Sequence, residues 1–143
     1  VHGSRGLGDV YKRQTYTTMS KELSDDSYYI LSFWATWCVP CINELDALNE
    51  VYDELSKDLN FKVYAISTDD ARTKRRVRPL VNGKSWKFDV LLDENHDLKR
   101  ALNISGLPHT IIAKQNEILH RRVGYAPGEE LDLLEKLKDY EVE

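Results

Sequence analysis

The feature that most constrains the fold is a pair of cysteines, the only two in the chain, set between an apolar run and an amphipathic one. The segment reads Phe33-Trp34-Ala35-Thr36-Trp37-Cys38-Val39-Pro40-Cys41. A buried strand followed directly by a helix would place this dithiol at a helix N-terminus, where unpaired N–H groups and the macrodipole stabilise an anion. A cysteine in such a position loses its proton more readily, and the thiolate is the form that attacks disulfides. The segment therefore predicts both a strand–helix turn and thiol chemistry.

The composition is that of one folded globular domain. The 143 residues suffice for a single well-filled core, and 41% of them are hydrophobic. A net charge of −4 does not indicate a polyanion-binding protein, so we expect no nucleic-acid partner. No apolar run reaches the roughly 18 residues that span a bilayer. Two cysteines also cannot build the disulfide framework of a small secreted scaffold.

Residues 1–14 differ in character from the rest of the chain. They show no apolar periodicity and combine three glycines with scattered charges. Their pattern resembles translated adaptor sequence, so they are left out of the fold prediction, and residues 15–143 are treated as a single domain. A natural disordered arm is the alternative. If the native beginning has been replaced, the lack of a signal peptide says nothing about export.

The first half of the chain predicts a βαβ unit. Residues 28–34 form a short, nearly continuous apolar run, typical of a strand buried on both faces. Between residues 45 and 59 apolar side chains recur at spacings of three and four, which predicts a helix with one buried stripe that ends near Asn60. Residues 61–67 predict a second strand, parallel to the first.

The second half alternates helical and extended patterns. Helical segments are expected at 96–102, at 128–140 and at 69–81, where Pro79 should kink or restart the helix. Extended segments are expected at 88–93, 110–113 and 118–123, the last two flanking a polar turn. The order βαβαβαββα predicts an α/β fold: a central mixed sheet with a C-terminal antiparallel hairpin and helices on both faces.

The residues around the dithiol resemble a known family. The segment from Trp34 to Cys41, followed by Glu44 and later by Gly106-Leu107-Pro108 before an apolar strand, is similar to the active site of thioredoxin-like proteins. Residues 81–93 and 108–110 resemble versions found in Bacteroidetes-type bacteria, and the similarity as a whole is strongest to the TlpA/ResA branch of thiol–disulfide oxidoreductases. It implies a thioredoxin fold and a periplasmic or cell-envelope location, and it is compatible with a membrane tether in the native precursor.

The resemblance assigns an order of action to the cysteines. Cys38 would attack a substrate disulfide and Cys41 would resolve the mixed disulfide, leaving the redox-active disulfide Cys38–Cys41. No other cofactor and no metal are expected. Val39 and Pro40 would tune the redox potential, which the sequence alone does not fix.

The same resemblance implies a substrate surface. Pro108 would follow a cis peptide bond after Leu107 and leave the Leu107 backbone free to pair with a substrate peptide opposite Cys38. Trp37 would shield the cysteines and offer an apolar surface. The expected substrate-binding residues are Trp37, Val39, Pro40, Leu107 and Pro108.

Two positions depart from thioredoxins proper. Ser32 stands where they carry a buried Asp, and Glu44, three residues after Cys41 on the same helix face, is the candidate to accept the proton of Cys41. A solvated Glu44 near a helix N-terminus is the alternative. His109 stands where Thr is more common, either as a nearby acid–base group or as a contact residue.

Other interpretations of the motifs are weaker. A two-residue spacing makes a poor structural staple, because the entropy gained grows with loop length. A zinc site needs about two further ligands, and His96, His109 and His120 form no pair at ligand spacing. The basic run at residues 72–78 is typical of a solvated helix face.

We therefore predict an enzyme, a thiol–disulfide oxidoreductase that acts as a reductant in the cell envelope. Its expected partners are protein disulfide or dithiol substrates and an upstream thiol electron donor, and it is expected to be a monomer. The alternatives are a peroxiredoxin-like peroxidase, although Ala35 replaces the Thr that usually precedes a peroxidatic cysteine, and a redox-inert thioredoxin-fold interaction module.

Overall fold

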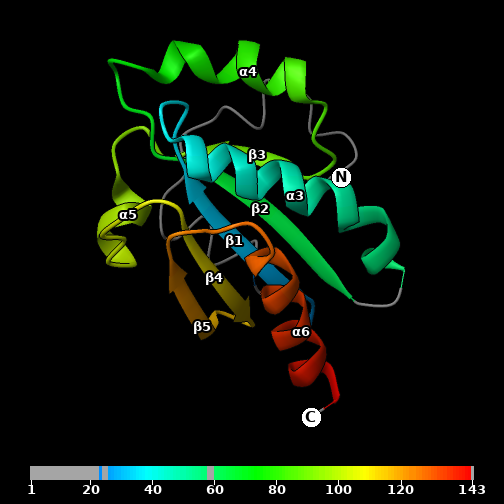
Figure 1. The fold of residues 1–143 in the computed structure, drawn as a ribbon. Helices are drawn as coiled ribbons and strands as arrows, with labels where there is room; N and C mark the ends of the chain where they lie inside the picture. Colours follow the sequence, from blue (N-terminus) through cyan, green and yellow to red (C-terminus); the bar gives the residue numbers. More distant parts are fainter. Residues whose placement is uncertain (1–22, 24–25, 58–59, 143) are drawn as a thin grey trace.

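The computed structural model describes residues 23, 26–57 and 60–142, which build a five-stranded mixed sheet (Figure 1). The strands are β1 (Tyr28–Trp34), β2 (Phe61–Ser67), β3 (Asp89–Leu92), β4 (His109–Lys114) and β5 (Glu117–Val123). Their order across the sheet is β3-β2-β1-β4-β5. The pairs β1–β2 and β2–β3 are parallel, whereas β1–β4 and β4–β5 are antiparallel. The predicted mixed sheet and C-terminal hairpin are confirmed.

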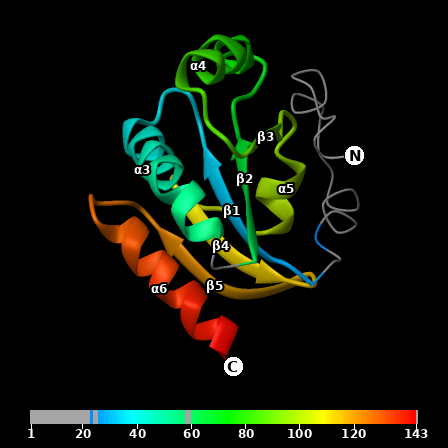
Figure 2. The same ribbon diagram turned by 90° about the vertical axis from the view of Figure 1, so that its right-hand side faces the viewer.

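Helices cover both faces of this sheet. In the described part of the chain they are α3 (Val39–Ser56), α4 (Val77–Lys84), α5 (Asp97–Ala101) and α6 (Glu129–Val142), with a 3₁₀ turn η2 (Lys74–Arg76) before α4. Figure 2 shows α3 and α6 on one face and α5 on the other. None of these helices is long and apolar enough to cross a membrane.

Strand β1 is the centre of the core, and its seven residues are all buried. Successive side chains of a strand point to opposite faces, so β1 contributes side chains to two core layers. Tyr28, Ile30 and Trp34 pack with apolar side chains of α3, α4 and α6. Tyr29, Leu31 and Phe33 pack with Leu98 of α5 and with residues of the neighbouring strands. The continuous apolar run in the sequence is explained by this two-sided burial.

The segment predicted as a helix over 69–81 behaves differently. Helical structure begins only at Lys74 and continues to Lys84, and the chain before it is held by side-chain hydrogen bonds to Asp69. Hydroxyl and carboxylate groups that bond to nearby backbone or side chains compete with helix formation. Pro79 is the third residue of α4, where its missing N–H has no intrahelical partner to lose, so it does not interrupt the helix.

A β-bulge in the terminal hairpin decides which way the side chains of β5 point. The pairing runs Lys114↔Glu117, Ala113↔Ile118 and then Ile112↔His120, which leaves Leu119 as an extra residue. Beyond the bulge, Thr110 pairs with Arg122 and Ile111 with Arg121. Residues directly opposite each other share a face. Arg122 therefore lies on the face that α3 covers, and Arg121 lies on the face of α5.

The segment 1–14, interpreted above as foreign leader sequence, lies outside the described residues. The rest of the predicted single domain, as far as it is described, contributes to the one sheet and its covering helices.

Candidate active site

The two cysteines lie at the start of α3, at the end of the central strand. The Cys38 carbonyl accepts the first helical hydrogen bond, from the Ile42 N–H at 3.2 Å, and the Cys38 N–H donates to the Ala35 carbonyl at 3.1 Å. Cys38 is thus the N-cap residue of α3, as the sequence predicts. Pro40 lies in the first turn, where a missing N–H is tolerated.

Cys38 and Cys41 form a disulfide, with their Cα atoms 5.3 Å apart. Their environments differ: Cys38 is 7% exposed, whereas Cys41 is fully enclosed at 0%. Of the two cysteines, only Cys38 retains some exposed surface and lines the neighbouring groove. Thiol exchange requires access to the attacked or attacking sulfur, so this asymmetry matches the predicted roles of an outer, attacking Cys38 and an inner, resolving Cys41.

Exposed apolar side chains flank Cys38. Trp37 is 60% exposed and Val39 is 67% exposed, and Pro40 is exposed beside them. A groove of about 290 Å³ lies next to Cys38, between Trp37 and the segment Ser105–Leu107. The Leu107–Pro108 peptide bond is cis, and Pro108 itself is buried while Leu107 lines the groove. Four of the five expected substrate residues are thus at least partly exposed, and Pro108 is buried.

Asp69 holds the loop in front of the dithiol. This buried carboxylate accepts the Thr36 N–H at 3.0 Å and the Thr36 hydroxyl at 2.6 Å. It also accepts the hydroxyls of Ser67 at 2.6 Å and Thr73 at 2.7 Å. One side chain therefore ties the turn before Cys38 to the end of β2 and to the segment that leads into η2.

Glu44 is fully buried, so the interpretation as a solvated residue is wrong. Its carboxylate accepts the Thr110 hydroxyl at 3.1 and 3.0 Å and the Ser32 hydroxyl at 3.5 Å, and it pairs with Arg122 Nη2 at 2.9 Å. Burial raises the pKa of Glu44 above its ordinary value, while the Arg122 charge and the hydrogen bonds oppose that shift. An acceptor with a raised pKa is better matched to a thiol than an exposed glutamate is.

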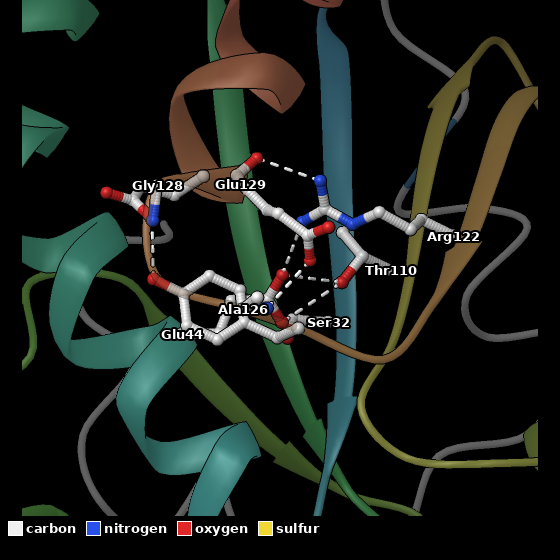
Figure 3. A network of polar contacts seen from close by, with 9 residues as sticks. Ser32, Glu44, Thr110, Arg122, Ala126, Gly128 and Glu129 are labelled. Atoms are coloured by element: carbon white, nitrogen blue, oxygen red, sulfur yellow. Dashed lines mark hydrogen bonds and ion pairs between the residues drawn. The ribbon is translucent and has the colours of Figure 1, made fainter.

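Three strands supply the partners of Glu44 (Figure 3). Ser32, Thr110 and Arg122 form one row across β1, β4 and β5, because Ser32 pairs with Thr110 and Thr110 with Arg122. Glu44 reaches this row from α3, which covers the same face. Ser32 occupies the position where thioredoxins proper carry an acid. The buried polar cluster thus pairs a carboxylate on α3 with a guanidinium cation on the outer strand β5.

His109 lies on the opposite face of the sheet. It pairs across the strands with Phe33, which belongs to the α5 layer, and its Nε2 lies 3.3 Å from Arg121 Nη1. Burial lowers the pKa of His109, and the neighbouring Arg121 charge lowers it further. The structure therefore does not bring His109 to Glu44, and a contact role agrees with its position.

Metal ligation finds no support in the described residues. Over these residues no group of three or more His, Cys, Asp or Glu side chains is arranged to hold a metal ion. The sulfurs of the CxxC motif are bonded to each other.

Comparison with known proteins assigns the family. A model described as the AhpC/TSA family matches residues 10–122. The chain belongs to the AhpC/TSA family. The match includes both cysteines, Glu44 and its partners Thr110 and Arg122.

Individual relatives of this AhpC/TSA member agree with the thioredoxin-like architecture. The thiol-disulfide oxidoreductase ResA of Bacillus thuringiensis (strain Al Hakam) is 29% identical over 103 residues, which cover 71% of this chain and 58% of the relative. The chain thus spans less than two thirds of that protein's length. A thioredoxin from Listeria monocytogenes is 29% identical over 123 residues, covering 86% of this chain and 93% of the relative.

A solved structure extends the agreement to three dimensions. An uncharacterized thioredoxin-like protein from Porphyromonas gingivalis superimposes with a TM-score of 0.69 at 38% identity. The match covers 79% of this chain and 74% of that one. The resemblance to thioredoxin-like, ResA-type proteins stated from the motifs is confirmed.

The sequence does not indicate the roles of two further residues of this AhpC/TSA family member. Arg122 lies in a segment that the sequence predicts as a strand, but nothing in its local pattern pairs it with Glu44. Asp69 begins a segment that the sequence predicts as a helix, although the cluster of Ser67, Thr68 and Thr73 around it is a usable signal for side-chain bonding.

Proposed function

We propose that this chain is a thiol–disulfide oxidoreductase that exchanges disulfides with protein substrates, as a reductant in the cell envelope. The observation that carries the proposal is the Cys38–Cys41 disulfide at the N-terminus of α3, in which Cys38 lines a surface groove and Cys41 is fully enclosed. The name of the ResA relatives supports the reaction class. The cell-envelope location rests on the resemblance to the TlpA/ResA branch.

The reduced enzyme would act in two exchanges. The Cys38 thiolate attacks one sulfur of a substrate disulfide, which forms the Cys38–substrate bond and releases the other substrate sulfur as a thiolate. The Cys41 thiolate then attacks the Cys38 sulfur, which forms Cys38–Cys41 and releases the second substrate thiolate. The substrate gains two electrons and the dithiol loses two. The helix N-terminus stabilises the Cys38 thiolate in the first exchange.

Glu44 would act in the second exchange. Cys41 is enclosed, so its proton must leave to a neighbouring group before the sulfur can attack. Glu44 lies one helical turn further along α3, where side chains three residues apart are neighbours. We assign it the role of proton acceptor for Cys41.

The substrate would lie over the apolar surface around Cys38. Trp37, Val39 and Pro40 offer exposed apolar contact area on one side, and Leu107, held by the cis bond to Pro108, lines the groove on the other. In this arrangement the Leu107 backbone can pair with an extended substrate segment, which adds main-chain hydrogen bonds to the apolar contact.

Insulin reduction by dithiothreitol tests the proposal. We expect the wild-type chain to accelerate the reduction and Cys38→Ser to abolish that acceleration. The absence of acceleration by the wild type would refute the catalytic assignment. The direction of electron flow is tested by a redox titration of the Cys38–Cys41 pair: a potential near the −270 mV of thioredoxin agrees with a reductant, whereas one near −120 mV indicates an oxidant.

The location is tested separately, by fractionating cells of the native host with an antibody against residues 26–142. A cytoplasmic protein would contradict the cell-envelope role without affecting the reaction.

A further inference from the structure

The buried carboxylate Glu44 has one cationic partner in the described part of the chain, Arg122. The Arg122 Nη2 lies 2.9 Å from Glu44 Oε2, with side-chain exposures of 18% and 0%. The pair joins α3 to β5, two elements separated by most of the chain. An ionised carboxylate in such an enclosed place requires a compensating charge or it takes up a proton.

A second contact fixes the position of the guanidinium. The Arg122 Nη1 donates to the Glu129 carbonyl at 2.8 Å, at the first residue of α6. Figure 3 shows the side chain extending from β5 between Glu44 and the beginning of α6. The two terminal nitrogens therefore bond to different elements, so the guanidinium is held at a fixed place relative to Glu44.

Other titratable groups lie near this pair on α3, on β5 and on the segment that leads into α6. On β5, His120 lies on the same face as Arg122, and its pKa is lowered by burial and by the Lys136 and Arg122 charges. Cys41 precedes Glu44 on α3, while β1 and β4 contribute only the hydroxyls of Ser32 and Thr110. From the segment between β5 and α6, the Tyr125 hydroxyl donates to Glu130 Oε1 of α6 at 2.5 Å. The pKa of Tyr125 is raised to about 12, first by burial and then by Glu130 and Glu44.

Tyr125 therefore stays neutral at physiological pH, and Glu130 is engaged by its hydroxyl and by the Gly128 N–H. Among the described residues, Arg122 is the cationic group bonded to the Glu44 carboxylate. It is the group whose removal would change the charge balance around Glu44 most directly.

We propose that Arg122 is a positioning residue for the resolving step: it keeps Glu44 ionised and in place, so that Glu44 can accept the Cys41 proton. The inference rests on the proposed function, because it assigns Glu44 as that acceptor. Without the guanidinium, the buried carboxylate would be protonated over a wider pH range and could not take the proton. Cys41 would then attack only at higher pH.

The experiment separates the two exchanges. Reduced protein is mixed with 5,5′-dithiobis(2-nitrobenzoate): attack by Cys38 releases one thionitrobenzoate, and attack by Cys41 on the resulting mixed disulfide releases the second. The rates of both phases are followed from pH 5 to pH 9 in stopped flow. In Arg122→Gln we expect the second phase to slow about tenfold at pH 7, with its midpoint shifted to higher pH, since positioned proton transfer contributes factors of this size or larger. The first phase should stay within about twofold of wild type, because Cys38 is stabilised by the helix N-terminus.

A matched control is the neighbouring arginine. Arg121 contacts the Leu102 carbonyl and His109 on the opposite face, so Arg121→Gln should leave the midpoint of the second phase unchanged. Glu44→Gln should slow the second phase as Arg122→Gln does, and the double variant should be no slower than Glu44→Gln alone, since the two residues act as a unit.

Arg122→Lys keeps the charge but cannot bond to both Glu44 and the Glu129 carbonyl, so we expect a smaller shift in the same direction. It also carries the test if Arg122→Gln does not fold. The role of Arg122 is overturned if the second phase keeps its wild-type pH profile in both Arg122→Gln and Arg122→Lys. If Arg122→Gln is unfolded, a wild-type profile in Arg122→Lys alone overturns it. A wild-type protein that shows no second release overturns the proposed function instead.

Discussion

The loop before the dithiol should owe much of its stability to a single carboxylate. Asp69 accepts four hydrogen bonds, from the Thr36 N–H and from the hydroxyls of Thr36, Ser67 and Thr73. In Asp69→Ala the hydroxyls of Thr36 and Thr73, which are partly exposed, can turn to water. The buried Ser67 hydroxyl and the Thr36 N–H lose their partner. Two hydrogen bonds to a charged group, at about 2 kcal/mol each, give an expected loss of about 4 kcal/mol in the free energy of unfolding.

Urea denaturation of the oxidised protein measures this loss, with the disulfide present in every variant. With an m-value of about 2 kcal/mol/M, the midpoint should fall by about 2 M. Asp69→Asn keeps one acceptor oxygen and should lose about half as much.

The adjacent residue provides the control. Asp70 pairs with Arg72, whose side chain is 86% exposed, so Asp70→Asn should leave the urea midpoint unchanged. If Asp69→Ala moved the midpoint no further than Asp70→Asn, the carboxylate would not be the group that holds the loop.

Three further predictions concern other parts of the molecule. The pKa of His109 is lowered in the folded protein, so the unfolded chain binds more protons, and stability is lost as the pH falls below about 6.5. His109→Gln should therefore reduce the pH dependence of the urea midpoint between pH 7 and pH 5. Tyr140→Phe removes the hydrogen bond to the Leu119 carbonyl and should lower stability by about 1 kcal/mol, seen in calorimetry as a fall in Tm of about 3 °C. Trp37→Ser removes an exposed indole and should raise KM for a protein disulfide while the urea midpoint stays the same; a lower midpoint would mean that Trp37 is structural.

The local parts of the fold could be predicted from the sequence because each has its own signal. The continuous apolar run of β1 indicates burial on both faces of the strand. The spacing of apolar residues in α3 indicates burial on one side of the helix. The CxxC motif between them fixes the turn, and the place of Cys38 at the helix start follows. The cysteine pair can be recognised from this local pattern alone, whereas the expected substrate surface depends on the resemblance to thioredoxin-like proteins.

The environment of Glu44 could not be predicted from the local sequence alone. Its position beside Cys41 follows from helix geometry, but its full burial depends on β4 and β5 covering it from the other end of the chain. The partner was harder still to predict. In a hairpin of unbroken register, with Lys114 opposite Glu117, Arg121 would lie opposite Thr110; the extra residue Leu119 shifts the pairing so that Arg122 does. A bulge of one residue cannot be read from the alternation of side chains in a short polar strand.

The segment before α4 could not be predicted for a related reason. Its composition suits a helix, and only the fold brings Thr36 close enough for Asp69 to bond to it. Side chains that find a tertiary partner hold the backbone out of the helix that their own sequence would allow.

The terminal helix α6 is joined to the sheet at both of its ends. At its first residue, the Glu129 carbonyl accepts a hydrogen bond from Arg122. Near its last turn, the Tyr140 carbonyl accepts the Tyr28 hydroxyl, and the Tyr140 hydroxyl donates to the Leu119 carbonyl. For a protein engineer this makes the C-terminal segment a poor place for a cleavage site or a short truncation. A fusion that removed Tyr140 would loosen the helix that supports Arg122. A change made far from the cysteines would then alter the acidity of Glu44.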